Sequence, residues 1–207
     1  MIFTEEQINS LRERVSAQMS DFRFVHTAEV EKMAERLGRL YAPDKLDLLR
    51  AAALLHDVTK ELKPDAQIQM LSDAGEFVSE FDIASPKTLH ARTAPLEIKQ
   101  RYAEFAHPEL LDAVRYHTTG RADMSVCECV IFLADYIDES RKFDDCVYLR
   151  NYFWSAEPEK MDAQARLKHL YETMIKAFDL TVAGLVAEKS LISAESIEAR
   201  NSLILKL

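Results

Sequence analysis

Turns suited to β-hairpins are almost absent from this chain. Its 207 residues include four glycines and no Asn-Gly or Asp-Gly pair. Such pairs are the usual two-residue hairpin connections, because both central residues need a positive φ. Apolar residues recur instead at helical spacing, as in Val30, Met33, Ala34 and Leu37. The sequence therefore predicts an all-α fold.

Capping residues and prolines indicate where the helices begin and end. Thr4 and Gln7 match a capping box, and Asp44 is expected to cap the third helix. Pro95 is expected to interrupt its helix, because proline lacks the backbone N–H that a helix needs. The expected helices cover about 4–19, 26–41, 44–57, 64–72, 85–102, 108–118, 124–137 and 162–188. No repeat or Gly/Ser linker divides them, so we expect a single domain over residues 1–207.

Composition and charge exclude several classes of protein. Hydrophobic residues make up 48% of the chain and charged residues 29%, which suits a packed core and not a disordered chain. No apolar run approaches the roughly 18 residues of a membrane span, and the first residues do not resemble a signal peptide. Three cysteines without a framework spacing favour reduced thiols. Together with the absence of a signal peptide, they lead us to expect a cytoplasmic protein. A net charge of -9 argues against broad nucleic-acid and membrane-surface binding.

One apolar run ends in two polar residues. Ala51–Leu55 leads directly into His56 and Asp57. Burying either side chain without a partner costs roughly 2 kcal/mol or more, and burying an ionised carboxylate costs far more. Asp135 poses the same problem inside "CVIFLADYI", which is typical of a buried helix. A metal cation bound by both aspartates would compensate both carboxylates.

Histidines supply the remaining ligands that such a site needs. The expected ligands are two imidazoles and two carboxylates, from His26, His56, Asp57 and Asp135. This set suits iron, manganese or zinc with room for water or a substrate oxygen. The alternative is a buried hydrogen-bonded network without a metal. Outside the site, His107 is expected at a loop or helix entry and His169 in a solvated stretch.

The order of these residues resembles that of the HD-domain metal-dependent phosphohydrolases. Four stretches are similar to successive motifs of the YqeK family of bacterial symmetrical diadenosine tetraphosphatases: "RFVHTAEVEKMAERLG", "AALLHDVTKEL", "LHARTAP" and "LDAVRYHTTGRADMSVCECVIFLADYIDESRKF". The resemblance covers about residues 20–180 and implies a helical HD-type core there, with a C-terminal helical extension. It also implies that the chain hydrolyses dinucleoside polyphosphates and cleaves diadenosine tetraphosphate symmetrically to two ADP.

The same resemblance implies roles for individual residues. It implies metal ligation by His26, His56, Asp57 and Asp135. It implies nucleotide contacts from Arg23, His26, Asp57, Lys60, His90, His117, Asp135 and Arg141, and catalytic roles for Asp57, Lys60, His90 and His117. The expected cofactor is a divalent cation, with iron favoured over manganese, cobalt or zinc. One ion is expected rather than two, because no spare carboxylate has a clear claim to a second. In this scheme the metal activates a water molecule and a histidine protonates the leaving ADP.

The chain departs from the family where the nucleotide pocket is expected. Ala91 stands where the family has glycine, Pro95 lies nearby, and Glu139-Ser140 replaces a Pro-Gly pair. Arg92 would supply an extra phosphate contact or lie in solvent. A different HD-type activity therefore stays open, either a 5′-nucleotidase or a guanosine-polyphosphate hydrolase, as does a non-catalytic nucleotide sensor. The aromatic stretch "YLRNYFW" leaves a homodimer open as well.

Overall fold

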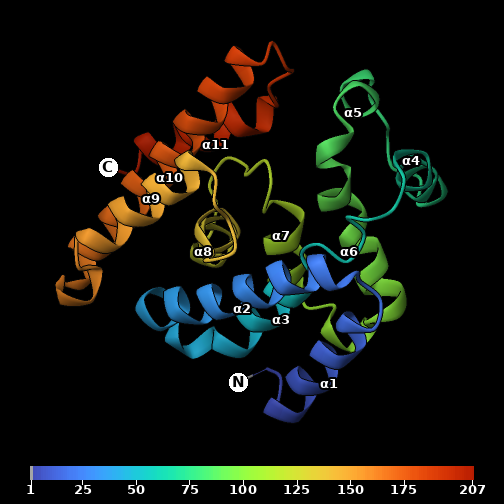
Figure 1. The fold of residues 1–207 in the computed structure, drawn as a ribbon, viewed down its shortest axis with the longest axis horizontal. Coiled ribbons are helices and arrows are strands. Elements are labelled where there is room, and N and C mark those ends of the chain that lie inside the picture. The colour runs from blue at the N-terminus through green and yellow to red at the C-terminus, as the bar shows by residue number, and fades with distance from the viewer. Residues whose placement is uncertain (1) are drawn as a thin grey trace.

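All of the regular structure in residues 2–207, the part of the chain that this computed structural model describes, is helical (Figure 1). The predicted all-α fold is therefore confirmed. The α-helices are α1 (Glu5–Ser16), α2 (Asp21–Tyr41), α3 (Leu46–Leu55), α4 (Pro64–Asp73), α5 (Glu80–Ala84), α6 (Leu89–Arg101), α7 (Pro108–Arg115), α8 (Val126–Ile137), α9 (Asp144–Ser155), α10 (Ala163–Ala187) and α11 (Ala194–Ile204). Short 3-10 turns lie at Pro43–Lys45, Pro86–Thr88, Ala103–Phe105 and Pro158–Lys160. None of the helices described is both long and apolar enough to cross a membrane.

The hydrophobic core forms around α3, which is apolar on nearly every face. Leu48, Leu49 and the run Ala51–Leu55 are fully buried, as expected of a helix enclosed by other helices. Helix α2 packs along α3 and against α8, while α7 contacts both α3 and α8. His56 and Asp57 follow the buried run and therefore lie inside the protein.

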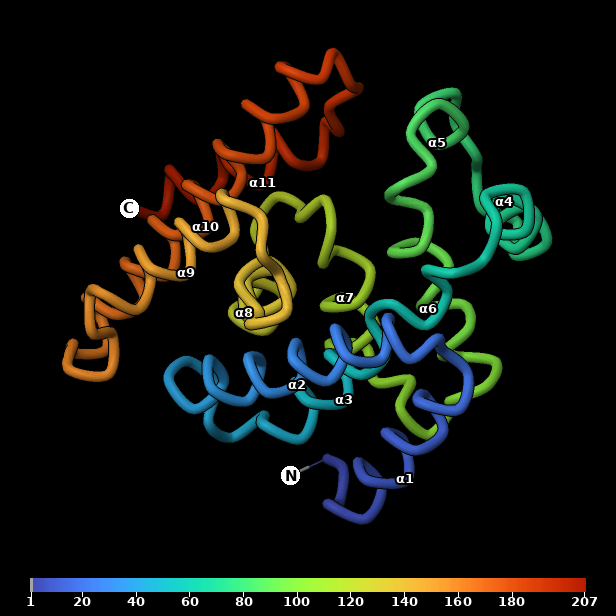
Figure 2. Tube along the Cα trace, viewed as in Figure 1, coloured from blue at the N-terminus to red at the C-terminus, as the bar shows by residue number. Residues whose placement is uncertain are grey.

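Two groups of helices extend from this core. Figure 2 shows α9, α10 and α11 on one side and α4, α5 and α6 on the other, with α7 and α8 between them. Helix α11 packs against α10, and α10 in turn packs against α8 and α9. The connection from α7 to α8 contains His117 and lies between the two groups of helices.

Two predicted helix starts differ from the observed ones for local reasons. Helix α2 begins at Asp21 and not near residue 26, because the Ser20 side chain caps it by accepting a hydrogen bond from the backbone N–H of Arg23. The predicted Asp44 cap is wrong. Asp44 lies within a 3-10 turn that Pro43 opens, and its side chain caps neither that turn nor α3.

The prediction that Pro95 interrupts its helix is also wrong. Helix α6 continues through Pro95 to Arg101. The proline removes a single backbone hydrogen bond, and its ring is buried. Helices α5, α9 and α11 were not predicted. Helix α5 is a single short turn, and the apolar residues of α9 and α11 do not follow a clear helical stripe.

Gly120 allows the α7–α8 connection to pack closely against the C-terminal helices. Its φ is +65°, a left-handed conformation that side chains disfavour. A Cβ atom at this position would lie 2.6 Å from Cζ of Phe178 on α10 and 2.9 Å from Cβ of Ala199 on α11. Glycine therefore meets a conformational requirement and a steric requirement at the same point.

We expect Gly120→Ala to lower the free energy of unfolding by about 3 kcal/mol, of which about 1 kcal/mol is left-handed backbone strain and the rest overpacking. Gly75→Ala is the matched control, because Gly75 has a φ of +74° but no atom within 4 Å of an added Cβ. This control should lose only about 1 kcal/mol. Urea denaturation of both variants measures the difference, and equal losses would contradict the steric argument.

Candidate metal centre

The structure brings all of the sequence-predicted site residues into one cluster at the centre of the helices. His26 projects from the second turn of α2, His56 and Asp57 follow α3, and Asp135 lies near the end of α8. His90 comes from the start of α6 and His117 from the residues after α7. The basic residues that border them are Arg23, Lys60 and Arg141.

Two imidazoles and two carboxylates surround one small space. Nε2 of His26 lies 3.0 Å from Oδ1 of Asp135 and 3.9 Å from Oδ2 of Asp57. Nε2 of His56 lies 3.6 Å from Oδ2 of Asp57 and 3.9 Å from Oδ1 of Asp135. Nε2 of each of these two histidines is therefore within 4 Å of both carboxylates. His26, His56 and Asp57 offer one group of atoms that can hold a metal ion, and His56, His117 and Asp135 offer another.

The opposite ring nitrogens of two of these histidines are already engaged. Nδ1 of His56 lies 2.6 Å from the carbonyl oxygen of Ala53, and Nδ1 of His117 lies 2.6 Å from that of Val114. Because a carbonyl can only accept, each Nδ1 carries the proton and each Nε2 presents a lone pair to the cluster. This is the usual arrangement of metal-binding histidines.

Unsatisfied polar atoms support the same assignment. The Nε2 atoms of His26 and His56 are buried and make no hydrogen bond. Buried nitrogens without a partner are costly in a native protein. A cation would satisfy the lone pair of His56 and would replace the proton that Asp135 favours on Nε2 of His26, so the residues present fit a divalent metal.

Ionisation differs between the two ends of the cluster. Burial disfavours the charged form of His26, but Asp135 and Asp138 outweigh this effect and raise its pKa to about 9. Burial, reinforced by His56, lowers the pKa of His117 to about 4. Burial and His117 also hold the pKa of His90 well below its ordinary value. The end at His26 thus carries the more negative potential and is the end that favours a cation.

Basic side chains border the carboxylates. Nη1 of Arg23 donates to Oδ2 of Asp57 at 2.8 Å, and Arg141 donates to both the carboxylate and the backbone carbonyl of Asp135. Nζ of Lys60 lies 3.2 Å and 3.1 Å from the two ring nitrogens of His90. Burial lowers the pKa of Lys60 from its ordinary value. These three cations surround a site that suits an anionic ligand.

His90 and His117 form a pair at the other end of the cluster. Their Nε2 atoms are 3.0 Å apart, and Nε2 of His90 also lies 3.3 Å from Oδ1 of Asp57. Because Nδ1 of His117 donates to a carbonyl, the proton between the two rings belongs to His90 in the neutral pair. Asp57, His90 and His117 are another group of atoms that could hold a metal ion.

Sequence reasoning missed Asp138 and the part played by Ser140. Asp138 is fully buried, and its Oδ2 lies 3.3 Å from Nδ1 of His26. The Ser140 hydroxyl donates to Asp138 and lies 3.3 Å from the same Nδ1. Asp138 could have been predicted from its position, because it is a second aspartate three residues after Asp135 in "ADYIDES". A carboxylate behind a metal-binding histidine commonly orients its ring.

Three other sequence expectations can be compared with the structure. The expectation that His169 is solvated is wrong. Its ring is buried and stacks on Phe153, and its Nε2 lies 3.1 Å from the Phe153 carbonyl oxygen. His107 precedes α7 as its N-cap residue, in agreement with a helix entry. Arg92 neither reaches the cluster nor lies free in solvent, because it pairs with Asp82 at 2.7 Å and Glu76 at 3.0 Å.

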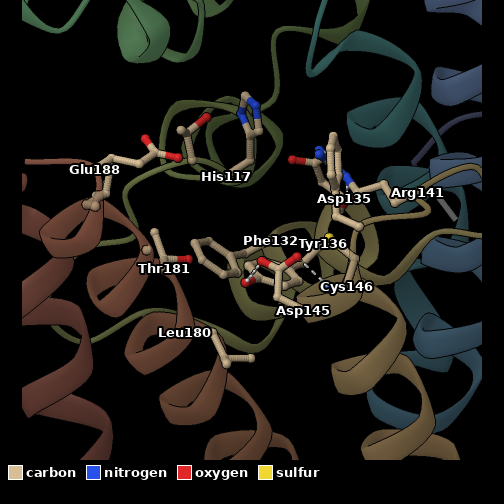
Figure 3. Close-up of a pocket in the computed structure, with 14 residues that line it drawn as sticks. His117, Phe132, Asp135, Tyr136, Arg141, Asp145, Cys146, Leu180, Thr181 and Glu188 are labelled. Atoms are coloured by element: carbon tan, nitrogen blue, oxygen red, sulfur yellow. Dashed lines mark hydrogen bonds and ion pairs between the residues drawn. The ribbon is translucent and has the colours of Figure 1, made fainter. Parts of the chain in front are cut away.

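A pocket of about 410 Å³ opens onto the cluster beside Asp135 and His117. Figure 3 shows Leu180 and Thr181 of α10, and Glu188 just after it, on the side opposite Asp135 and Arg141. Its volume lies in the roughly 300–1,000 Å³ range of small-molecule sites. The α10 residues of this pocket were not predicted, because nothing in their local sequence indicates which distant helix they face.

Comparison with known proteins agrees with this geometry. The family model described as "HD domain" matches residues 23–140. A Bacillus subtilis protein named bis(5'-nucleosyl)-tetraphosphatase, symmetrical, is 31% identical over 129 residues, which are 62% of this chain and 68% of that protein. A Halalkalibacterium halodurans protein of the same name is 28% identical over 194 residues, which are 93% of this chain and 94% of the relative.

A solved structure shares the whole architecture. It is a predicted HD superfamily hydrolase involved in NAD metabolism from Clostridium acetobutylicum. The two structures align with a TM-score of 0.81 and 25% sequence identity, over 96% of this chain and 97% of the other. The similarity therefore extends beyond the matched family region to the C-terminal helices.

We expect a divalent cation to stabilise the protein through this cluster. At a free concentration one hundred times the dissociation constant, the gain in unfolding free energy is about 2.7 kcal/mol. A chelator should remove the gain. His56→Gln should abolish the response, whereas the matched control His107→Gln, outside the cluster, should keep it. Thermal unfolding with and without manganese measures the effect, and an equal response of both variants would contradict the assignment.

Proposed function

The chain belongs to the HD domain family, and from this we propose that it is a metal-dependent phosphohydrolase that cleaves dinucleoside polyphosphates, taking diadenosine tetraphosphate symmetrically to two ADP. The observation that carries the proposal is the convergence of the Nε2 atoms of His26 and His56 on two carboxylates, with Nε2 of His56 buried and without a hydrogen bond. The printed names of the Bacillus and Halalkalibacterium relatives support the substrate and the cleavage position.

The proposed metal ligands are His26, His56, Asp57 and Asp135. When bound there, a divalent cation supplies Lewis-acid activation of water and neutralises charge on the phosphoryl oxygens. We propose iron as the native ion, because a set of imidazole and carboxylate ligands suits it, with manganese, cobalt or zinc as alternatives.

We propose one ion and not two. The second candidate group, Asp57 with His90 and His117, lies beside the ammonium group of Lys60. A positive charge about 3 Å from His90 repels a second cation at that position. Asp138 is a further carboxylate near the cluster that was not predicted. It lies behind His26, at the opposite end of the cluster from His90, so it cannot bind an ion there.

Three basic residues are proposed to position the polyphosphate. Arg23 and Arg141 each hold a carboxylate of the cluster, so their guanidinium groups are oriented before a substrate arrives. Guanidinium groups bind phosphate oxygens in a bidentate manner. Lys60 adds a third cation on the His90 side. Charge that develops on the phosphoryl oxygens during cleavage would be stabilised by donors that need little reorganisation.

The His90–His117 pair is proposed to handle the proton that the leaving ADP requires. The two rings hold one proton between their Nε2 atoms, and that proton belongs to His90 because His117 donates through Nδ1 to a carbonyl. Thr118 also places its hydroxyl 3.3 Å from Nε2 of His90. A neutral imidazole is too weak an acid for this step, so the pair would first take up the proton that the attacking water loses. Transfer of that proton from the resulting imidazolium to the departing oxygen would be general acid catalysis.

Product analysis tests the proposed reaction. Metal-replete protein incubated with diadenosine tetraphosphate should give ADP as the only nucleotide product in chromatography. Asp57→Asn keeps the side-chain shape but removes a ligand charge, so it should lower kcat by at least about a hundredfold. Asp65→Asn, at an exposed position on α4, is the matched control and should stay active.

Other products would contradict specific parts of the proposal. ATP with AMP would keep the phosphohydrolase and overturn the symmetrical cleavage position. Absence of turnover by metal-loaded protein would overturn the dinucleotide substrate. Turnover of nucleoside monophosphates or guanosine polyphosphates would then identify a different HD-type activity, and turnover of none of them would leave a nucleotide sensor.

A further inference from the structure

Two phenylalanine rings are exposed beside the metal centre. Phe22, on the first turn of α2, is 82% exposed, and Phe143, just before α9, is 68% exposed. Both line a second pocket of about 520 Å³, together with Arg23, His26 and the segment 140–142. Large exposed aromatic rings that share a pocket commonly serve recognition, because leaving them in water is unfavourable.

This second pocket is distinct from the pocket in Figure 3, yet both reach the same cluster. The pocket in Figure 3 meets the cluster at Asp135 and His117, whereas the second pocket meets it at His26. Arg141 and Phe143 line both, so they form the wall between them. Nε2 of His26 lies 3.0 Å from Asp135, which places the two openings side by side at the proposed reaction centre.

The charge of the second pocket suits an anion with an aromatic end. Its lining includes Arg23, Arg141 and Lys142 and no carboxylate, whereas the pocket in Figure 3 also contains Asp145 and Glu188. Nε of Arg23 is buried and has no hydrogen-bond partner. Basic side chains next to two exposed rings match a phosphate followed by a nucleobase.

We propose that the second pocket binds one nucleoside diphosphate half of the substrate, with its base stacked on Phe22 and Phe143, while the pocket in Figure 3 binds the other half. The inference rests on the proposed cleavage of a dinucleoside polyphosphate. Symmetrical cleavage requires that the central bridge lie at the reaction centre, so a nucleoside must extend from it in each direction. A single pocket accommodates only one of them.

Phe22 is the residue to test, because it lines the second pocket and does not line the pocket in Figure 3. Phe22→Ala should raise KM for diadenosine tetraphosphate roughly five- to hundredfold, the usual effect of losing one base stack. It should leave KM unchanged for adenosine 5′-tetraphosphate, which has only one nucleoside. Phe22→Tyr should behave as wild type. Phe77→Ala is the matched control, because Phe77 is 81% exposed and lies far from α2 in the chain.

Binding of ADP provides a second readout that does not depend on turnover. Calorimetry should find two ADP molecules per wild-type chain and per Phe77→Ala chain, and one per Phe22→Ala chain. If wild-type protein does not hydrolyse diadenosine tetraphosphate, the proposed function fails, and the ADP stoichiometry still decides on the second pocket.

Three results would overturn the inference. The first is that Phe22→Ala matches Phe77→Ala in both KM and ADP stoichiometry. The second is an equal rise in KM for both tetraphosphates, which would mean that Phe22 does not serve a second nucleoside. The third is a change from dimer to monomer in Phe22→Ala with unchanged ADP binding, which would assign the exposed rings to a subunit interface.

Discussion

The structure depends on the attraction between buried carboxylates and a positive charge that must lie between them. Asp57 is buried and the Asp135 side chain is only 18% exposed, and both face the Nε2 atoms of His26 and His56. Carboxylates in such surroundings are costly unless they are paired or bind a cation. The protein supplies partial compensation through Arg23 and Arg141 but leaves the imidazole nitrogens unsatisfied. A metal ion resolves both deficits at once.

The helices around the cluster determine which way each ligand points. Helix α3 is enclosed by α2, α7 and α8, so His56 and Asp57, which follow it directly, are buried. Backbone carbonyls of Ala53 and Val114 hold two imidazole rings by Nδ1, while Asp138 and Ser140 lie against the ring of His26. Ligands held in this way lose little conformational freedom when an ion binds, which favours a rigid site.

Much of the site could be predicted because its residues conflict with their local sequence. A histidine and an aspartate at the end of an apolar run, and an aspartate inside another, have no explanation within one helix. Asp138 was missed because it lies at a helix end, where a polar residue needs no explanation. Leu180, Thr181 and Glu188 could not be assigned, because their place in the pocket depends on how α10 packs against α8. His169 was misread because Phe153, sixteen residues away in the chain, provides its burial and its partner.

Anomalous diffraction from crystals grown with manganese tests the central claim most directly. The account predicts one strong anomalous peak, bounded by the side chains of His26, His56, Asp57 and Asp135, and none between His90 and His117. Absence of a peak among the first four side chains would show that hydrogen bonds alone stabilise the cluster. A second peak beside His90 would show that Lys60 does not exclude another ion.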